Sequence, residues 1–136
     1  MDFEKIKIQI IQLAKAHDNI ELLWLYGSHA KGNAHAKSDI DLAVAFKTWE
    51  AGIIERRLRP ELLALEWQKK LNLPEGQLSI LDITNAPIPI AMSVLQNGEL
   101  LINKNTSRQL QEQQRIMSMW EIDYLYHYQH YHAFNG

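Results

Sequence analysis

The sequence predicts an α/β fold in which a small mixed β-sheet is flanked by helices. Three observations predict it. The chain has 136 residues, of which 46% are hydrophobic. Short apolar runs alternate with segments of helical periodicity, and turn residues separate them. Because domains commonly contain about 100–150 residues, we expect one globular unit with its own hydrophobic core.

The first half of the chain predicts a helix and two strands. Residues 3–17 carry apolar side chains at helical spacing and predict a helix. Residues 21–26 (ELLWLY) form an apolar run that predicts a buried strand. Residues 27–38 contain glycines and little periodicity, so we expect a turn, one or two helical turns and a loop. Residues 39–46 (DIDLAVAF) predict the second strand.

The middle of the chain predicts helices and a third strand. Residues 49–57 predict a short helix. Pro60 suits the first position of a second helix, which runs to about Leu71. Residues 77–83 (QLSILDI) predict a strand.

The remainder predicts two helices around a short extended piece. One helix begins near Pro87 and ends at Gly98, a residue suited to a C-terminal cap. Residues 99–102 predict a short strand. A long final helix is expected over residues 108–127.

Composition and charge exclude several classes of protein. The chain has no cysteine, which excludes disulfide scaffolds, thiol catalysis and cysteine-ligated zinc. Lys and Arg total 14 against 16 Asp and Glu, so a protein that mainly wraps nucleic acid is not expected. No apolar run approaches the roughly 18–20 residues of a membrane span, and no signal peptide is recognisable. We expect a cytoplasmic protein with no membrane contact and no direct nucleic-acid binding.

Residues that can carry chemistry are concentrated in residues 27–41, GSHAKGNAHAKSDID. Gly27 and Ser28 follow an apolar strand directly. A glycine lets the backbone approach a ligand, and the exposed amides of a helix start favour a phosphate. Asp39 and Asp41 are two residues apart on a strand, so both carboxylates are expected on the same side.

A third carboxylate, Asp82, lies in the third predicted strand between Leu81 and Ile83. Because these neighbours face the core, we expect Asp82 to face the opposite way and to share a face with Asp39 and Asp41. Three carboxylates around one space repel one another, and a hard cation such as Mg²⁺ removes that conflict. A phosphate-binding turn beside such a cluster predicts metal-assisted phosphoryl or nucleotidyl transfer.

The motif resembles the signature of DNA polymerase β-like nucleotidyltransferases, in which Gly-Ser is followed, after ten intervening residues, by Asp-x-Asp. The longer string GSHAKGNAHAKSDIDLAV is similar to the pattern of the minimal nucleotidyltransferase (MNT) group, GS-x-A-[RK]-G-x-A-x-x-x-SDIDLAV. Asp82 stands where that family carries its third strand carboxylate, and residues 98–102 (GELLI) resemble its closing segment. The resemblance covers about residues 3–103 and implies the polymerase β-like nucleotidyltransferase fold.

The resemblance also implies roles for the matching residues. Asp39 and Asp41 would hold metal ions and the triphosphate, and Asp82 would ligate a second metal and help to deprotonate the attacking hydroxyl. The Gly-Ser pair would bind the β- and γ-phosphates. The nucleotide-binding residues implied by the match are Gly27, Ser28, Lys31 and Ser38. The expected cofactor is Mg²⁺, with two ions during turnover, and the expected substrate is ATP.

Minimal members of this group resemble the chain in size and are typically paired with a HEPN-domain protein. The leading hypothesis is therefore an antitoxin that transfers AMP from ATP to a tyrosine hydroxyl of a HEPN ribonuclease toxin and so neutralises it. One alternative is a nucleotidyltransferase that acts on a small molecule or RNA. Another is a non-catalytic nucleotide-binding module that neutralises its partner by steric contact.

The C-terminal segment is rich in aromatic residues. We expect residues 1–105 to form the nucleotidyltransferase domain and residues 106–136 a helical extension. Aromatic residues spaced by four, four and three would share one helix face; they are Trp120, Tyr124, Tyr128 and Tyr131. This face either packs on the domain or binds a partner, and the sequence leaves both open.

Overall fold

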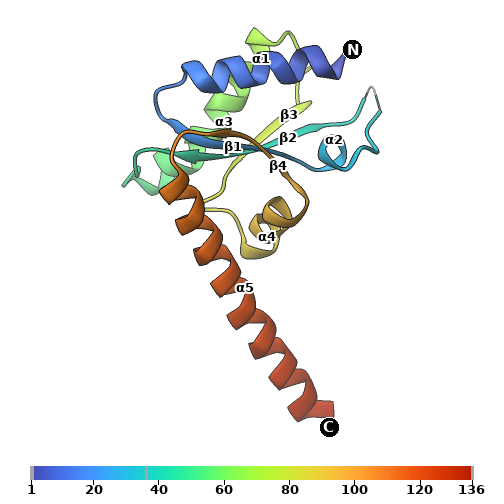
Figure 1. The fold of residues 1–136 in the computed structure, drawn as a ribbon, viewed down its shortest axis with the longest axis vertical. Helices are drawn as coiled ribbons and strands as arrows, with labels where there is room; N and C mark the ends of the chain where they lie inside the picture. The colour runs from blue at the N-terminus through green and yellow to red at the C-terminus, as the bar shows by residue number, and fades with distance from the viewer. Residues whose placement is uncertain (1, 36, 136) are drawn as a thin grey trace.

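The computed structural model describes residues 2–35 and 37–135, with side chains described as far as residue 126. In chain order the elements are α1 (Phe3–Ala16), β1 (Ile20–Tyr26), α2 (Ser28–Lys31), β2 (Ile40–Phe46), α3 (Ile53–Lys70), β3 (Leu78–Asp82), α4 (Ile88–Asn97), β4 (Glu99–Asn103) and α5 (Thr106–Asn135). Figure 1 shows α1 and α3 on one side of the sheet, and α4 with the start of α5 on the other. The predicted mixed α/β fold is confirmed.

The sheet contains both strand orientations. Its order is β3-β2-β1-β4. The two central strands, β1 and β2, are antiparallel, and β4 is antiparallel to β1. The edge strand β3 runs parallel to β2, and α3 makes the crossover between them. The first residues of β2 and β3 and the last residues of β1 therefore lie at the same end of the strands in the sheet.

Each face of the sheet has its own hydrophobic cluster because strand side chains alternate between faces. Leu42 of β2 packs with Trp67 of α3 in the cluster beneath α1 and α3. Ala43, the next residue, packs with Val94 of α4 and Ile116 of α5 in the cluster on the opposite face. Alternate residues of a strand, those with even and those with odd numbers, therefore pack against different pairs of helices.

Two helices differ from the prediction. The middle segment forms one helix, α3, with Pro60 in its interior rather than at a helix start. Pro60 is buried, together with Leu63 and Trp67. A proline removes one helical hydrogen bond and crowds the preceding turn, and burial of this apolar face against the sheet offsets that cost.

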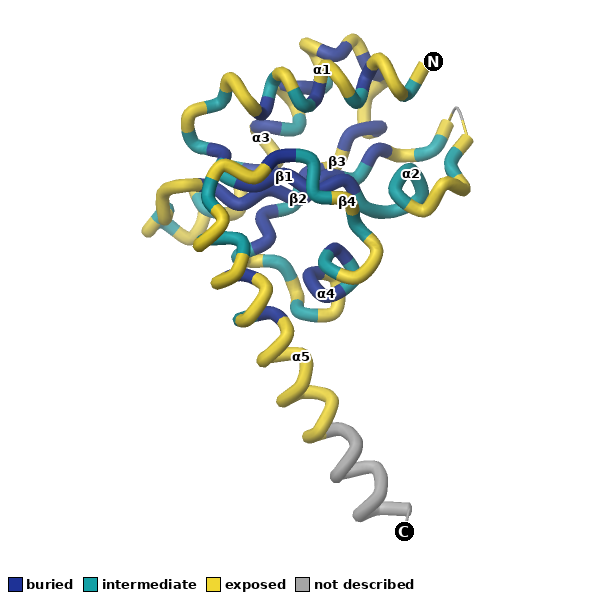
Figure 2. Tube along the Cα trace, viewed as in Figure 1, coloured by how far each residue is buried: buried dark blue, intermediate teal, exposed yellow. Residues whose placement is uncertain are grey.

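The last helix, α5, is longer than the predicted 108–127 segment and begins at Thr106. Of the α5 residues whose side chains are described, Ile116 is the last that is buried, and residues 117–126 are all exposed. Figure 2 shows that the first part of α5, up to Ile116 (the root of α5), contains buried residues, whereas residues 117–126 (the exposed shaft of α5) leave the body of the molecule on the α4 side. Among the described residues, no helix combines the length and apolar character needed to cross a membrane.

Candidate active site

The carboxylate of Asp41 lies near the start of β2 and directly beside the backbone of the first glycine of the motif. Asp41 is paired with Tyr26 in the antiparallel β1–β2 ladder. Gly27 follows Tyr26 with φ of +74°, in the region that favours glycine. A Cβ built on Gly27 would overlap Asp41 Oδ2 and lie 3.2 Å from its Cγ. Gly27 therefore allows the turn to close onto this carboxylate.

The turn continues into the short helix α2, which carries Ser28 and Lys31. The carbonyl oxygen of Gly27 accepts hydrogen bonds from the amides of Ala30 at 3.2 Å and Lys31 at 3.1 Å. Gly32 ends the helix with φ of +76°. Ser28 is half-buried at the start of α2, and the Lys31 side chain is exposed at its end. Their roles in binding nucleotide stay predictions.

Ser38 holds the loop that leads into β2. Its hydroxyl accepts a hydrogen bond from the amide of His35 at 2.9 Å, and its own amide donates to the His35 carbonyl at 2.9 Å. The Ser38 carbonyl oxygen accepts from Gln77 Nε2 at 3.2 Å. These contacts fix the backbone immediately before Asp39. The structure thus gives the predicted nucleotide-binding residue Ser38 a loop-positioning contact.

Negative charge is crowded around Asp41. Asp39 is exposed, and Asp41 is half-buried. Burial raises the pKa of Asp41, the neighbouring charge of Asp39 raises it further, and His29 opposes them. Burial, followed by the charge of Asp41, raises the pKa of Tyr26 to about 12. The His29 ring stacks on Phe3 of α1 with ring centroids 4.0 Å apart, which holds the imidazole at this end of the sheet.

The two carboxylates fit a magnesium ion. They are two residues apart, and burial and then the charge of Asp39 raise the pKa of Asp41, so a bound cation would relieve the crowded negative charge. Mg²⁺ is usually held by one or two carboxylates together with substrate phosphates and waters. A cavity of about 290 Å³ lies beside Asp39; its lining residues are Lys37, Asp39, Pro74, Glu75, Gly76 and Gln77. Asp39 and Asp41 would hold the ion between them, and of the two only Asp39 lines this cavity.

Asp82 does not join this pair, which corrects the predicted three-carboxylate cluster. In the parallel β2–β3 ladder Asp82 pairs with Val44, whereas Asp41 pairs with Ser79. Three residues of strand span about 10 Å. Residue parity also places Asp82 on the α1/α3 face with Leu78 and Ile80, opposite to the face of Asp41. Among the described residues, no group of three His, Cys, Asp or Glu side chains could hold a metal.

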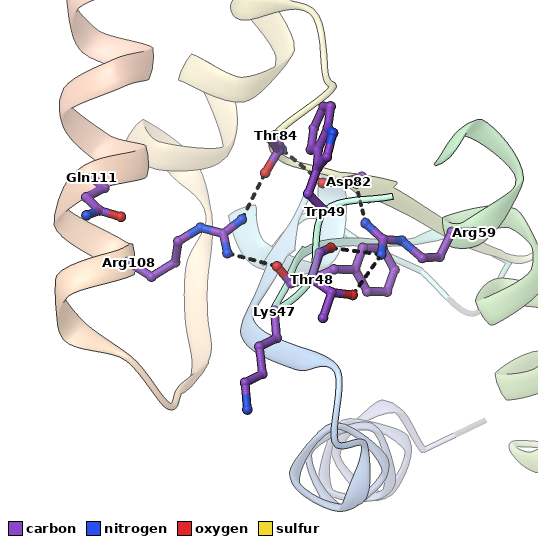
Figure 3. A pocket seen from close by; sticks show the side chains of 9 residues that line it. Lys47, Thr48, Trp49, Arg59, Asp82, Thr84, Arg108 and Gln111 are labelled. Atoms are coloured by element: carbon purple, nitrogen blue, oxygen red, sulfur yellow. Dashed lines mark hydrogen bonds and ion pairs between the residues drawn. The ribbon is translucent and has the colours of Figure 1, made fainter. Parts of the chain in front are cut away.

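Asp82 instead caps the turn after β3. It is 5% exposed and accepts hydrogen bonds from the Thr84 amide at 3.0 Å and from Asn85 Nδ2 at 2.9 Å. Arg59 Nη2 of α3 lies 3.7 Å from its carboxylate. Figure 3 shows Asp82, Thr84 and Arg59 in a separate pocket. This pocket has a volume of about 280 Å³ and is also lined by Arg108 and Trp49.

The alternation of residues within β3 could have predicted which face of the sheet carries Asp82. Asp82 lies two and four residues from apolar Ile80 and Leu78, so alternation groups it with them. Ser79, the polar residue between those two, is the residue that reaches the face of Asp41. Tyr26 was also missed, because its pairing with Asp41 depends on strand register across an irregular loop.

The structure describes the side chains of two of the four residues predicted to bind a partner. Trp120 and Tyr124 lie beyond Ile116 with 38% and 58% of their surface exposed. Neither belongs to the two core clusters, which favours the partner-binding alternative for these two residues, and partner binding stays a prediction. Tyr128 and Tyr131 lie outside the residues whose side chains are described.

Comparisons with known proteins agree with this geometry. Residues 8–107 match the family described as "Polymerase beta, Nucleotidyltransferase". The fold is similar to a toxin–antitoxin structure with AMP-PNP, at 24% identity over 86% of each chain with a TM-score of 0.64. It is also similar to the toxin–antitoxin MntA-HepT, at 20% identity over 87% of this chain and 86% of that chain, with a TM-score of 0.62.

A third similar structure is that of tri-AMPylated Shewanella oneidensis HEPN toxin in complex with MNT antitoxin, at 20% identity, 87% and 86% coverage and a TM-score of 0.63. No curated protein sequence matches the chain. The structural likenesses show a shared fold, and the family match covers most of the chain, including the Gly-Ser turn and the Asp39/Asp41 pair. The chain belongs to the polymerase beta nucleotidyltransferase family.

Proposed function

We propose that this protein is a metal-dependent nucleotidyltransferase that transfers AMP from ATP to a tyrosine hydroxyl of a HEPN ribonuclease toxin, and so acts as an antitoxin. The observation that carries the proposal is the packing of the Asp41 carboxylate against the backbone of Gly27, with Asp39 two residues away. Similar folds in a complex with AMP-PNP and in a complex with a tri-AMPylated HEPN toxin support the nucleotide and the acceptor.

In the proposed reaction the phenolic oxygen of the toxin attacks the α-phosphorus of ATP. A bond between this oxygen and the α-phosphorus forms, the bond from the α-phosphorus to the oxygen bridging to the β-phosphate breaks, and pyrophosphate leaves. The phenolic proton passes to solvent. Gly27 and Ser28 would orient the β- and γ-phosphates, and Lys31 would add positive charge near them. Mg²⁺ held by the carboxylate pair would neutralise charge that develops on the leaving group.

The exposed part of α5 is the proposed surface for the toxin. Apolar and aromatic side chains are exposed along it: Met117, Met119, Trp120, Ile122, Tyr124, Leu125 and Tyr126. Aromatic residues and methionine are enriched in the buried centres of protein interfaces. Trp120 and Tyr124 are one helical turn apart on one face, and we assign them the central contacts.

One observation favours a second candidate, the non-catalytic module. An intact set of three carboxylates would argue for catalysis, and the structure brings only Asp39 and Asp41 together. A module with this pair could still bind a nucleotide with Mg²⁺ and neutralise the toxin by contact alone. Catalysis and contact must therefore be separated by experiment.

Label transfer in a lysate of the source cells tests the proposal. The purified protein and Mg²⁺ would receive ATP labelled at the α-phosphate or, in parallel, at the γ-phosphate. We expect one protein band labelled from the α-position only, with a mass that identifies a HEPN protein. A band labelled only from the γ-position would mean kinase chemistry, and labelled RNA or a labelled small molecule would move the acceptor to those classes.

The matched control is the Asp39→Asn/Asp41→Asn variant, which removes both charges and keeps the side-chain shapes. It should bind the partner and leave it unlabelled and toxic. If this variant neutralises the partner fully, contact alone is sufficient and the non-catalytic module replaces the transferase.

A further inference from the structure

The residue beside Asp41 on the neighbouring strand is a serine. Ser79 pairs with Asp41 in the parallel β2–β3 ladder. The flanking residues Leu78 and Ile80 pack in the α1/α3 cluster, so Ser79 points to the opposite face of the sheet, as Asp41 does. Its side chain is exposed and open to a ligand. Ser79 is therefore the β3 residue best placed to complete a metal site with Asp41.

A serine hydroxyl can contact a cation, but it carries no charge and so does not supply the charge neutralisation that a carboxylate would give in this position. Hard cations take oxygen ligands, and charge neutralisation by carboxylates accounts for much of their retention. Two cations in one reaction site lie about 3.5–4 Å apart and repel each other, so they need more anionic ligands than one cation does. Asp82, the nearest carboxylate along β3, is committed to Arg59 and to the turn after the strand on the other face.

Glu75 is the remaining carboxylate to consider on this side of the molecule. It lines the same cavity as Asp39. It lies on the exposed turn before β3, and among the described residues it forms no three-ligand group with the aspartate pair. The protein side of the site is thus limited to two carboxylates, which matches the ligands of a single Mg²⁺ bound with a triphosphate.

We infer that the nucleotide-bound protein holds one divalent cation, through Asp39 and Asp41, and that Ser79 occupies the place where a carboxylate would create a second cation site. This inference rests on the proposed function and limits its chemistry. Among the described residues, no third carboxylate joins Asp39 and Asp41 to accept the proton of the attacking hydroxyl. A phenol, with a pKa of about 10, releases its proton more readily than an alcohol does, which suits a tyrosine acceptor.

The ion count can be measured directly by native mass spectrometry. The full chain would be saturated with α,β-methylene-ATP and titrated with Mn²⁺, and the ions in each chain–nucleotide complex counted. We expect one ion in the wild type and two in Ser79→Asp. Ser79→Asn has nearly the same shape without the charge and should stay at one, as should Glu75→Gln and Asp82→Asn.

Several outcomes separate this inference from the proposed function. Two ions in the wild type would overturn the inference and leave nucleotidyl transfer intact. A Ser79→Asp variant that melts as the wild type does and still holds one ion would also overturn it. No ion in any nucleotide complex would refute both proposals, whereas one bound ion without label transfer would refute the proposed function alone.

Discussion

Gly27 adopts a positive φ of +74° while its backbone touches the side chain of Asp41. We predict that Gly27→Ala reduces label transfer at least tenfold, because the added methyl group must displace the carboxylate. The left-handed conformation adds a backbone cost, so stability should fall by about 1–3 kcal/mol. Label transfer at saturating ATP and urea unfolding measure the two effects.

Gly32 offers a matched control for this substitution. Its φ is +76°, nearly that of Gly27, and a Cβ built on it meets nothing within 4 Å. The ψ of Gly27 is −155°, in a region almost restricted to glycine, whereas the ψ of Gly32 is 12°, in the left-handed helical region that other residues can adopt. Gly32→Ala should therefore lose less stability than Gly27→Ala and keep most of its activity. Equal losses of activity in the two variants would mean that backbone strain in the turn, and not the position of Asp41, limits the reaction.

At the scale of single residues, local spacing was predictive and strand register was not. Gly27, Asp39 and Asp41 could be identified because their relation is set within a few residues of chain and by strand alternation. The relation of Asp82 to Asp41 depends on how β2 and β3 align after an intervening helix of 18 residues. The prediction considered only the two apolar neighbours of Asp82 and therefore placed it on the wrong face. Alternation with Leu78 and Ile80, four and two residues earlier in the strand, gives the correct face.

At the scale of elements, hydrophobic periodicity predicted the strands and helices with small boundary differences. The exception was α3, where a local rule about Pro60 divided one helix into two. Tertiary packing decided the outcome, since Leu63 and Trp67 on the following turns are buried on the same face. The extent of α5 agrees with the helical extension expected over residues 106–136, although periodicity alone predicted the helix only over residues 108–127.

The root of α5 is attached to the sheet by a buried ionic network around Glu112, which is 6% exposed. Glu112 accepts hydrogen bonds from Arg108 Nε at 3.0 Å and from Arg115 Nη2 at 2.8 Å. Arg108 also donates to the Phe46 carbonyl at 2.8 Å and to Thr84 Oγ1 at 3.1 Å. The network therefore joins α5 to the ends of β2 and β3.

This network predicts a pH dependence of stability. Burial raises the pKa of Glu112, but hydrogen bonds from Arg115 and Arg108 outweigh it, so the pKa lies below its usual 4.5. A lowered pKa stabilises the fold above pH 4.5, and this contribution is lost as the pH falls through the lower folded value. We expect Glu112→Gln to cost about 1–3 kcal/mol at pH 7 and less at pH 3.

Urea unfolding of the wild type and Glu112→Gln between pH 3 and pH 7 checks this expectation. Glu121→Gln is the control, because Glu121 is an exposed glutamate on the same helix. Its unfolding curves should follow those of the wild type at every pH. Parallel pH profiles for the wild type and Glu112→Gln would show that the carboxylate charge contributes no stability to the attachment of α5.

At the scale of the whole molecule, the exposed shaft of α5 and the carboxylate of Asp41 lie on the same side of the sheet. Asp41 has the parity of Ala43 and Ala45, which pack with α4 and the root of α5. Figure 1 shows α5 leaving the body on that side. A protein bound along residues 117–126 would therefore approach the face that carries the active site. In the proposed function, this arrangement combines partner binding with presentation of an acceptor hydroxyl.

This arrangement predicts that partner binding and folding can be separated on α5. Trp120→Ala/Tyr124→Ala should leave the melting temperature unchanged, since both side chains are exposed. It should weaken toxin binding about ten- to a hundredfold, as expected for aromatic hot spots. Label transfer should fall at low toxin concentration and recover at high concentration, because the reacting groups are intact. Ile54→Ala, which shortens an exposed apolar residue of α3 outside the proposed surface, should bind normally. A lower melting temperature with unchanged toxin affinity would instead assign this face of α5 to the stability of the fold.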